Sequence, residues 1–316
     1  RSNEMSQFAF VFPGQGSQAV GMLDAWGDHP AVAQTLQEAS DALGEDVARL
    51  IAQGPKDALD LTTNTQPVML AAGVACYRAW IAETGKEPSV VAGHSLGEYT
   101  ALVAAGALDL AAALPLVRFR AQAMQEAVPV GAGGMAAILG LEAADVQAGC
   151  AEAASAVGEA VEAVNFNDPK QTVIAGTKAA VEKACEVLKA RGAKRALALP
   201  VSAPFHSSLM KPAAERLRER LAGTVFETPR IDVVNNIDVK VESDPAAIRD
   251  ALYRQAFGPV RWVETVQALR ARGATLVVEC GPGKVLAGMV KRIDAELPSA
   301  NVFDPASLAE VKGMLA

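Results

Sequence analysis

The chain has 316 residues, 51% of them hydrophobic and 21% charged, with a formal net charge of −7. Its length and apolar content are enough for one large or two smaller domains. Because the net charge is negative, we do not expect it to bind nucleic acid. Its four cysteines are scattered and form no CxxC pair, which is typical of reduced thiols in a cytosolic protein and argues against a disulfide framework or a zinc site. No apolar run reaches membrane-spanning length and no N-terminal signal peptide is recognisable, so we expect a cytoplasmic protein without a membrane partner.

The first predicted element is a short strand over residues 8–12, where five apolar residues in a row indicate burial on both faces. The loop 13–18, Pro-Gly-Gln-Gly-Ser-Gln, does not fit the dinucleotide-binding fingerprint, and its glycines suggest a backbone that approaches another group closely. Apolar residues at three- and four-residue steps predict a helix from residue 29 to about residue 52. A second apolar helix is expected over residues 66–82, with Pro67 in its first turn.

Residues 93–97, Gly-His-Ser-Leu-Gly, lie between an apolar strand at 90–92 and a helical pattern over 98–105. Strand, sharp turn and helix together predict a nucleophile elbow, in which Ser95 stands out of a tight turn at the carboxyl edge of a sheet. The helix N-terminus then directs unpaired N–H groups at whatever the serine attacks. The alternative is a small-residue turn in which Ser95 only caps the helix, but the two glycines and both flanking elements favour the nucleophile.

The next predicted helix begins at Asp109, which is suited to cap it. Its apolar stripe runs from residue 114 to residue 128, and Pro115 is expected to kink or restart it. Arg118 and Arg120 fall on opposite edges of the stripe. Helical geometry alone therefore leaves open which of the two arginines faces a site.

A glycine-rich change of composition at residues 129–134 indicates a domain boundary. The elements predicted beyond it are a strand at 135–139, a helix at 143–157, strands at 160–164 and 172–175, a helix capped by Thr177 and stopped by Gly192, and a strand at 195–199. This βαββαβ order is that of a ferredoxin-like unit. We therefore expect a small ferredoxin-like subdomain over residues 131–199, inserted in a larger domain.

The larger domain is expected to resume near residue 200. Its predicted elements are a polar loop at 202–208, a helix to about 221, a strand at 231–234, helices at 248–256 and 262–271, and a strand at 276–279. The loop after this last strand lacks the spacing and the Lys-Ser/Thr pair of a Walker A motif. The fold class predicted is thus α/β: a large α/β-hydrolase-like domain with a parallel sheet, formed by residues 5–130 and 200–316, plus the inserted subdomain.

A serine hydroxyl needs a base to become a nucleophile, and the chain has three histidines. His29 precedes a proline at a predicted helix start and is interpreted as a surface residue. His94 adjoins Ser95, and its side chain should point away from the serine in an elbow. His206 is therefore the candidate base by elimination, with a satisfied loop histidine as the alternative. No acid stands out as a third member: Glu279 either reaches the site or anchors a loop, and a backbone carbonyl can also orient a histidine.

Five blocks of sequence occur in a characteristic order. They are Phe-Pro-Gly-Gln-Gly-Ser-Gln at 12–18, Gly-His-Ser-Leu-Gly-Glu-Tyr at 93–99, the region of Arg120, Ala-Pro-Phe-His at 203–206, and Arg254-Gln255 with Pro259-Val260. From Met5 onward the chain resembles the malonyl-CoA:acyl-carrier-protein transacylases of bacterial type II fatty-acid synthesis. Gly-x-Ser-x-Gly alone would indicate only some serine acyl enzyme, whereas the five blocks together are specific.

The resemblance implies a set of catalytic roles. Ser95 would attack the malonyl thioester, with His206 as general base and later as acid for the departing thiol. The oxyanion would sit between the backbone N–H groups of Gln15 and Leu96. The main-chain carbonyl of Gln255 would orient the histidine, which agrees with the lack of a candidate aspartate.

The resemblance also implies how the acyl group is recognised. Arg120, rather than Arg118, matches the arginine that pairs with the malonyl carboxylate, the alternative being a solvated helix arginine. Phe205 resembles the malonyl-selecting pattern, since a bulky ring would crowd an α-methyl group. Asn167 is a candidate for lining the site from the small subdomain, although a role in a turn explains it equally well.

The implied reaction is a ping-pong transfer of malonyl from malonyl-CoA to the phosphopantetheine thiol of an acidic acyl carrier protein. The enzyme is expected to be a monomer that binds no cofactor and no metal. The basic residues suited to such a partner are Lys189, Arg191, Lys194 and Arg195, or Lys284, Lys291 and Arg292. The alternatives are a serine thioesterase or hydrolase, an acyltransferase that serves a polyketide synthase, and a non-catalytic carrier-binding subunit.

Overall fold

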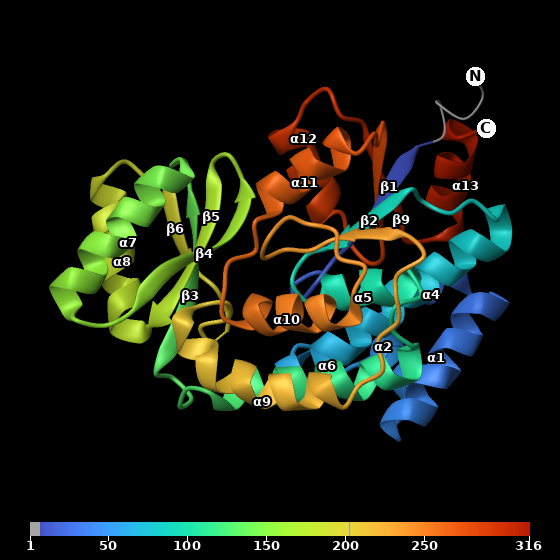
Figure 1. Cartoon of the computed structure of the whole chain (residues 1–316), viewed down its shortest axis with the longest axis horizontal. Coiled ribbons are helices and arrows are strands. Elements are labelled where there is room, and N and C mark those ends of the chain that lie inside the picture. The colour runs from blue at the N-terminus through green and yellow to red at the C-terminus, as the bar shows by residue number, and fades with distance from the viewer. Residues whose placement is uncertain (1–6, 202) are drawn as a thin grey trace.

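The structure is a computed structural model that describes residues 7–201 and 203–316. Two separate β-sheets organise the chain (Figure 1). A parallel sheet lies in the larger part of the molecule between layers of helices, and an antiparallel sheet with two helices lies at the end far from the C-terminal helix (Figure 1). The chain is therefore a mixed α/β protein, as predicted.

The large sheet consists of β1 (Phe8–Phe12), β2 (Val90–Gly93), β7 (Asp232–Val234), β8 (Leu276–Cys280) and β9 (Ser299–Val302). Its order is β7-β2-β1-β8-β9, and every neighbouring pair is parallel. The central strand β1 is buried along its whole length, which explains its unbroken apolar run. Because Phe12 pairs with Gly93 and Val11 with Glu279, the loops that follow β1, β2 and β8 meet at one edge of the sheet.

Helices cover both faces of this sheet. They are α1 (Pro30–Leu43), α2 (Val47–Gln53), α3 (Lys56–Leu59), α4 (Thr62–Thr84), α5 (Gly97–Ala104), α6 (Leu110–Glu126), α9 (Lys211–Ala222), α10 (Pro245–Ala256), α11 (Trp262–Ala271), α12 (Val285–Ile293) and α13 (Pro305–Met314), with 3-10 turns η1 (Asp24–Trp26) and η2 (Ser208–Met210). Phe8, Phe10 and Phe12 belong to the core that includes α4, whereas Ala9 and Val11 belong to the core that includes α11 and α12. The alternation along β1 thus divides the interior into two layers.

Three details of the predicted helices are wrong. The helix expected from residue 29 to about 52 is two helices, because Gly44 adopts a left-handed conformation (φ 67°) that ends α1. Helix α4 begins at Thr62, so Pro67 lies inside it and not in its first turn. Of the kink or restart predicted at Pro115, the restart does not occur, because α6 runs from Leu110 to Glu126 as one helix. Packing on the large core outweighs the lost hydrogen bonds at both prolines.

The second sheet consists of β3 (Gly133–Leu139), β4 (Val161–Asp168), β5 (Gln171–Thr177) and β6 (Arg195–Ala198), with α7 (Ala143–Val157) and α8 (Lys178–Ala190) between them. Its order is β4-β5-β3-β6, and every neighbouring pair is antiparallel. The strands and helices follow one another in the predicted order. The turn predicted at residues 167–170 is present at Pro169 and Lys170, but strand β4 extends to Asp168, so Asn167 lies in the strand and not in the turn.

Strand β4 joins the two parts of the molecule. The backbone of Val260, between α10 and α11, exchanges hydrogen bonds with Val164 and Phe166 at 2.8 and 3.0 Å. The buried carboxylate of Asp168 pairs with Nε of Arg292 on α12 at 2.7 Å. The small sheet is thereby held against the carboxyl edge of the large one.

The C-terminal region contains three elements that are not among those predicted, namely α12, β9 and α13. Helix α12 follows directly after the loop of residues 281–284, and β9 adds a parallel strand at the edge of the large sheet. None of the helices in the described part of the chain is long and apolar enough to cross a membrane.

Candidate active site

Ser95 lies in the turn between β2 and α5, where the sequence predicts the elbow. Its φ is 54°, a left-handed conformation that non-glycine residues rarely adopt and that costs about 1–3 kcal/mol. A Cβ atom on Gly93 would lie 1.8 Å from the carbonyl oxygen of Gly97, and one on Gly97 would lie 2.1 Å from that of Phe12. The two glycines therefore permit the close approach of strand and helix that exposes the serine.

His206 lies against this serine, with its Nε2 2.7 Å from Ser95 Oγ. Its Nδ1 is 2.8 Å from the backbone carbonyl oxygen of Gln255. Because a carbonyl can only accept, Nδ1 carries the proton and Nε2 presents a lone pair to the hydroxyl. Burial and the positive charge of Arg120 lower the pKa of His206 to about 3. The imidazole is therefore neutral at neutral pH and able to accept a proton from Ser95.

The place beside His206 is occupied by a backbone group and not by a carboxylate. Among the described residues, none of the acidic side chains hydrogen-bonds to His206. Glu279 is fully buried, and its Oε1 accepts a hydrogen bond of 3.0 Å from the backbone of Ala287 in the first turn of α12. Burial raises the pKa of Glu279 to about 8. Of its two predicted roles, anchoring the segment after β8 is the one that the contacts support.

Arg120 extends from α6 to the nucleophile. Its guanidinium is buried, with Nη1 donating to Gln66 Oε1 at 2.7 Å and Nη2 donating to Gln255 Oε1 at 3.0 Å. Nη2 also lies 3.4 Å from Ser95 Oγ, and Nε is without a hydrogen-bond partner among the described residues. A cation held by neutral amides beside a nucleophile is suited to bind a carboxylate on the acyl group. Arg118 faces the other way, into a surface ion pair.

The loop after β1 lies against the elbow. A Cβ atom on Gly14 would lie 2.6 Å from the carbonyl oxygen of His94, which is the close approach that the glycines of this loop suggest. The side chain of Gln15 turns away to Thr62 at 3.0 Å. Within the described residues, the backbone N–H groups of Gln15 and Leu96 donate to no other group, and both residues line the cavity at Ser95. These two amides are available to an oxyanion.

Two adjoining cavities contain the remaining candidates. Ser95 and His206 line a cavity of about 120 Å³, and the ring of Phe205 forms part of its wall. Several of its lining residues also line a larger cavity of about 600 Å³, whose walls come from the loop after β1, from α12 and from the small sheet, including Asn167. The side chain of Asn167 is hydrogen-bonded to His94 Nε2 at 2.7 Å. Phe205 is thus placed at the nucleophile and Asn167 at the approach to it.

Sequence reasoning missed two buried polar residues of the site. Gln66 on α4 holds Arg120, and Asn236 after β7 bonds to the backbone on both sides of His94. A signal for Asn236 exists: an asparagine pair directly follows a strand of a parallel sheet, at the edge where such folds place their sites. A single glutamine in an apolar helix carries no comparable signal.

The basic residues considered for an acidic partner are partly engaged. Arg191 pairs with Glu152 at 2.9 Å, and Arg292 pairs with Asp168. The described part of the chain holds no group of three or more His, Cys, Asp or Glu side chains arranged to bind a metal ion.

Comparison with known proteins gives one consistent result. Residues 9–309 match the family of acyl transferase domains. The malonyl CoA-acyl carrier protein transacylase of Salmonella typhimurium is 53% identical over 306 residues, which span 96% of this chain and 98% of that protein. The crystal structure of an acyl-carrier-protein S-malonyltransferase from Burkholderia pseudomallei is 69% identical, with a TM-score of 0.96 over 97% of this chain and 99% of that one. A malonyl-transacylase in complex with its type II PKS acyl-carrier protein is 51% identical, with a TM-score of 0.95 over 98% and 99% of the two chains.

Proposed function

This chain belongs to the acyl transferase family and, within it, to the malonyl-CoA:acyl-carrier-protein transacylases, and from that premise we propose that Ser95 carries the malonyl group between two thiols. The enzyme transfers malonyl from malonyl-CoA to acyl carrier protein and so supplies extender units for fatty-acid synthesis. The observation that supports this mechanism is the position of Ser95 Oγ, 2.7 Å from a neutral histidine and 3.4 Å from a buried arginine.

The first half-reaction loads the serine. His206 Nε2 accepts the hydroxyl proton while Ser95 Oγ attacks the thioester carbonyl carbon. The carbonyl oxygen becomes an oxyanion between the N–H groups of Gln15 and Leu96. As the tetrahedral intermediate collapses, the carbon–sulfur bond breaks and the proton on His206 goes to the departing CoA thiol. The products are free CoA and a malonyl ester of Ser95.

The second half-reaction reverses these steps with a different thiol. The phosphopantetheine thiol of the carrier gives its proton to His206 and attacks the ester carbonyl of malonyl-Ser95. The serine then departs as an alcohol, with its proton returned by His206 Nε2. Throughout both halves the carbonyl of Gln255 keeps Nδ1 protonated and the imidazole plane fixed, so the same nitrogen serves as base and as acid.

Arg120 binds the free carboxylate of the malonyl group. Its Nη2 atom is near Ser95 Oγ, so a carboxylate two bonds beyond the reacting carbonyl can reach the guanidinium. Charged hydrogen bonds of this kind are worth about 1.5–3 kcal/mol each. Phe205 forms the wall of the same small cavity and limits the space beside the malonyl methylene.

The larger cavity suits the arm of either thiol donor. Its walls come from the loop after β1, from α12 and from the small sheet, it shares lining residues with the cavity at Ser95, and its volume of about 600 Å³ lies in the range of small-molecule sites. This placement supports a division into a catalytic domain of residues 5–130 and 200–316, hydrolase-like around its elbow, and a ferredoxin-like subdomain of residues 131–199. Residues 5, 6 and 202 of this division lie outside the described residues. We take the enzyme to be a cytoplasmic monomer that needs no bound cofactor.

Intact-mass measurement after mixing with malonyl-CoA tests the loading step. The wild-type chain should gain the mass of one malonyl group, and addition of phosphopantetheinylated carrier protein should remove it. Ser95→Ala should gain nothing, while Ser208→Ala, a serine in η2 outside the candidate site, should load as the wild type does. A chain that gains no malonyl adduct, or gains one in the Ser95→Ala variant, would contradict the mechanism.

A second carrier is favoured by one comparison. The structural relative solved with a type II PKS acyl-carrier protein is 51% identical to this chain, so transfer to a polyketide carrier is the second candidate function. Transfer rates from the loaded enzyme to a fatty-acid carrier and to a polyketide carrier, measured side by side, decide between the two.

A further inference from the structure

The backbone of the elbow is held by two amide side chains from other elements. Ser95 has the strained φ of 54°, and such a conformation persists only where its surroundings hold it. Asn236 Oδ1 accepts a hydrogen bond from the N–H of Ser95 at 2.9 Å, and its Nδ2 donates to the carbonyl of Gly93 at 2.8 Å. One side chain thus binds the peptide groups on both sides of His94, immediately before the nucleophile.

The second amide belongs to Gln255. Its Nε2 donates to the carbonyl oxygen of Ser95 at 3.0 Å and to Asn236 Oδ1 at 3.3 Å. The C=O of Ser95 and the N–H of Leu96 share one planar trans peptide, in which they point in opposite directions. Fixing that carbonyl therefore also fixes the direction of the Leu96 N–H, the donor available to the oxyanion.

Asn236 is itself held on every side. Its backbone N–H donates to Oε1 of the buried Glu98 at 2.7 Å, and its side-chain Oδ1 accepts from both Ser95 and Gln255. A carboxamide is required here, since this position accepts from two N–H groups and donates to one carbonyl. Neither an aspartate nor an aliphatic side chain can do both.

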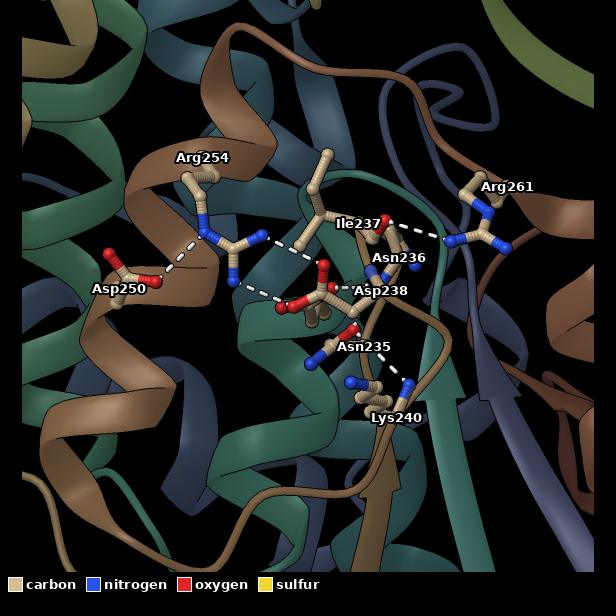
Figure 2. A network of polar contacts seen from close by, with 9 residues as sticks. Asn235, Asn236, Ile237, Asp238, Lys240, Asp250, Arg254 and Arg261 are labelled. Atoms are coloured by element: carbon tan, nitrogen blue, oxygen red, sulfur yellow. Dashed lines mark hydrogen bonds and ion pairs between the residues drawn. The ribbon is translucent and has the colours of Figure 1, made fainter.

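The loop that carries Asn236 is fastened to α10 and to the start of α11 (Figure 2). Asp238 forms a two-pronged ion pair with Arg254, at 2.8 and 2.6 Å. Arg261 donates from Nη1 to the carbonyl of Ile237 at 3.3 Å. These contacts fix the two residues that follow Asn236 and so limit the movement of its side chain relative to the elbow.

From this arrangement we propose that Asn236 is a positioning residue of the transfer reaction, which holds the elbow so that Ser95 Oγ meets His206 and the Leu96 N–H faces the oxyanion. The inference rests on the proposed function in one respect, that Ser95 is the nucleophile. By occupying the N–H of Ser95, Asn236 also takes that donor out of competition for the oxyanion. Asn236 makes no hydrogen bond to Arg120, and Gln255, which holds that arginine, is also fixed by its own bond to the Ser95 carbonyl, so we place substrate binding outside the role of Asn236.

The test compares Asn236→Ala and Asn236→Asp with the wild type in single-turnover loading of malonyl-CoA. The alanine variant loses all three bonds, so its loading rate should fall about 10²-fold, as expected for a misplaced nucleophile. Its apparent affinity for malonyl-CoA should stay within about twofold, because Arg120 keeps its own hydrogen bonds to Gln66 and Gln255. Asn236→Asp keeps an acceptor for the Ser95 N–H and loses the donor to Gly93, so its loading rate should lie between those of the other two.

Labelling of Ser95 by a fluorophosphonate gives a second readout that involves neither malonyl nor a carrier. The labelling rates of the variants should follow the same order as their loading rates. The fluorophosphonate tests the positioning role of Asn236 separately from the proposed malonyl transfer. Slow labelling of Asn236→Ala supports the positioning role even in a chain that fails to transfer malonyl. If Asn236→Ala loads and is labelled within twofold of the wild type, the proposal is wrong. If the alanine variant does not fold, a wild-type labelling rate in Asn236→Asp overturns it equally.

Discussion

Arg118 and Arg120 lie two residues apart on α6 and occupy opposite environments. Arg118 is partly exposed at the edge of the helix and pairs with the carboxylate of Glu45 at 2.5 Å. Arg120 is 1% exposed, and no carboxylate of the described residues lies within 4 Å of its guanidinium. Its partners are two neutral amides and the face of the Tyr99 ring, 5.5 Å away. The arginine exposed to water has an acid, and the buried arginine does not.

This difference is informative because burying a charge without a counter-ion is costly. Glu98, the acid that follows the elbow in the sequence, compensates the charge of Arg120 only in part: burial raises the pKa of Glu98 to about 7, and its Oε1 accepts from the backbone of Asn236. Burial likewise lowers the pKa of Arg120, although a guanidinium stays charged. A buried cation with no carboxylate in contact supports the proposal that Arg120 pairs with a carboxylate of the substrate.

The largest effect is expected from removing this cation. Arg120→Met should lower kcat/KM for malonyl-CoA by about 10²-fold or more, since two charged hydrogen bonds at about 1.5–3 kcal/mol each are lost. Preference should shift toward neutral acyl groups such as acetyl. Arg118→Met is the matched control and should retain malonyl transfer within about twofold. Equal losses of kcat/KM for malonyl-CoA in Arg120→Met and Arg118→Met would show that the two arginines do not differ in function.

A smaller effect is expected from giving Arg120 the acid that Arg118 already has. Gln66→Glu places a carboxylate at the atom that accepts from Arg120 Nη1. The new ion pair should compete with the malonyl carboxylate and raise KM for malonyl-CoA about tenfold to a hundredfold, as one charged hydrogen bond would. Glu45→Gln, which removes the acid from Arg118, should leave KM unchanged. An unaltered KM in Gln66→Glu would remove Arg120 from the acyl-binding site.

The charge of Arg120 also bears on the pH dependence of the nucleophile. The pKa of His206 is lowered to about 3, first by burial and second by Arg120, from an ordinary value of 6.5. In Arg120→Met the burial remains and the repulsion is lost, so the imidazolium becomes more favourable and the pKa rises, though it stays below 6.5. The acid limb of Ser95 labelling by a fluorophosphonate should therefore move to higher pH. In Arg118→Met it should not move, and coincident profiles for all three proteins would contradict this electrostatic account.

The comparison also shows how far sequence reasoning reaches. The elbow could be predicted because five consecutive residues and their flanking elements determine it, and His206 because the chain holds only three histidines. The periodicity of α6 could not separate its two arginines, because what distinguishes Arg120 is contact with Gln66 and Gln255, 54 and 135 positions away. Asn236 was missed for the same reason, since the elbow residues that it and its backbone bind, Gly93, Ser95 and Glu98, lie more than 130 positions away.

The smallest effect is expected at Arg118, whose charge is already paired with Glu45. Glu45→Ala should lower the free energy of unfolding by about 1 kcal/mol or less, because both side chains are partly exposed, at 39% for Glu45 and 20% for Arg118. Arg118 also keeps its hydrogen bond to the carbonyl of Thr63 at 3.2 Å. Urea unfolding at low and high salt measures the effect, and salt should diminish it further.

Glu45→Ala also tests, from the side of Arg118, whether Arg118 and Arg120 differ in function. A solvated ion pair adds little to stability and has no route to the reaction, so Glu45→Ala should leave the loading of Ser95 unchanged. If Glu45→Ala slows loading, α6 must transmit a structural change from Arg118 at its exposed edge to Arg120 at its buried edge. The lack of an acid at Arg120 would then no longer identify the substrate-binding arginine by itself. With loading intact, the two positions on one helix separate an arginine that is paired by the fold from one that is left for a ligand.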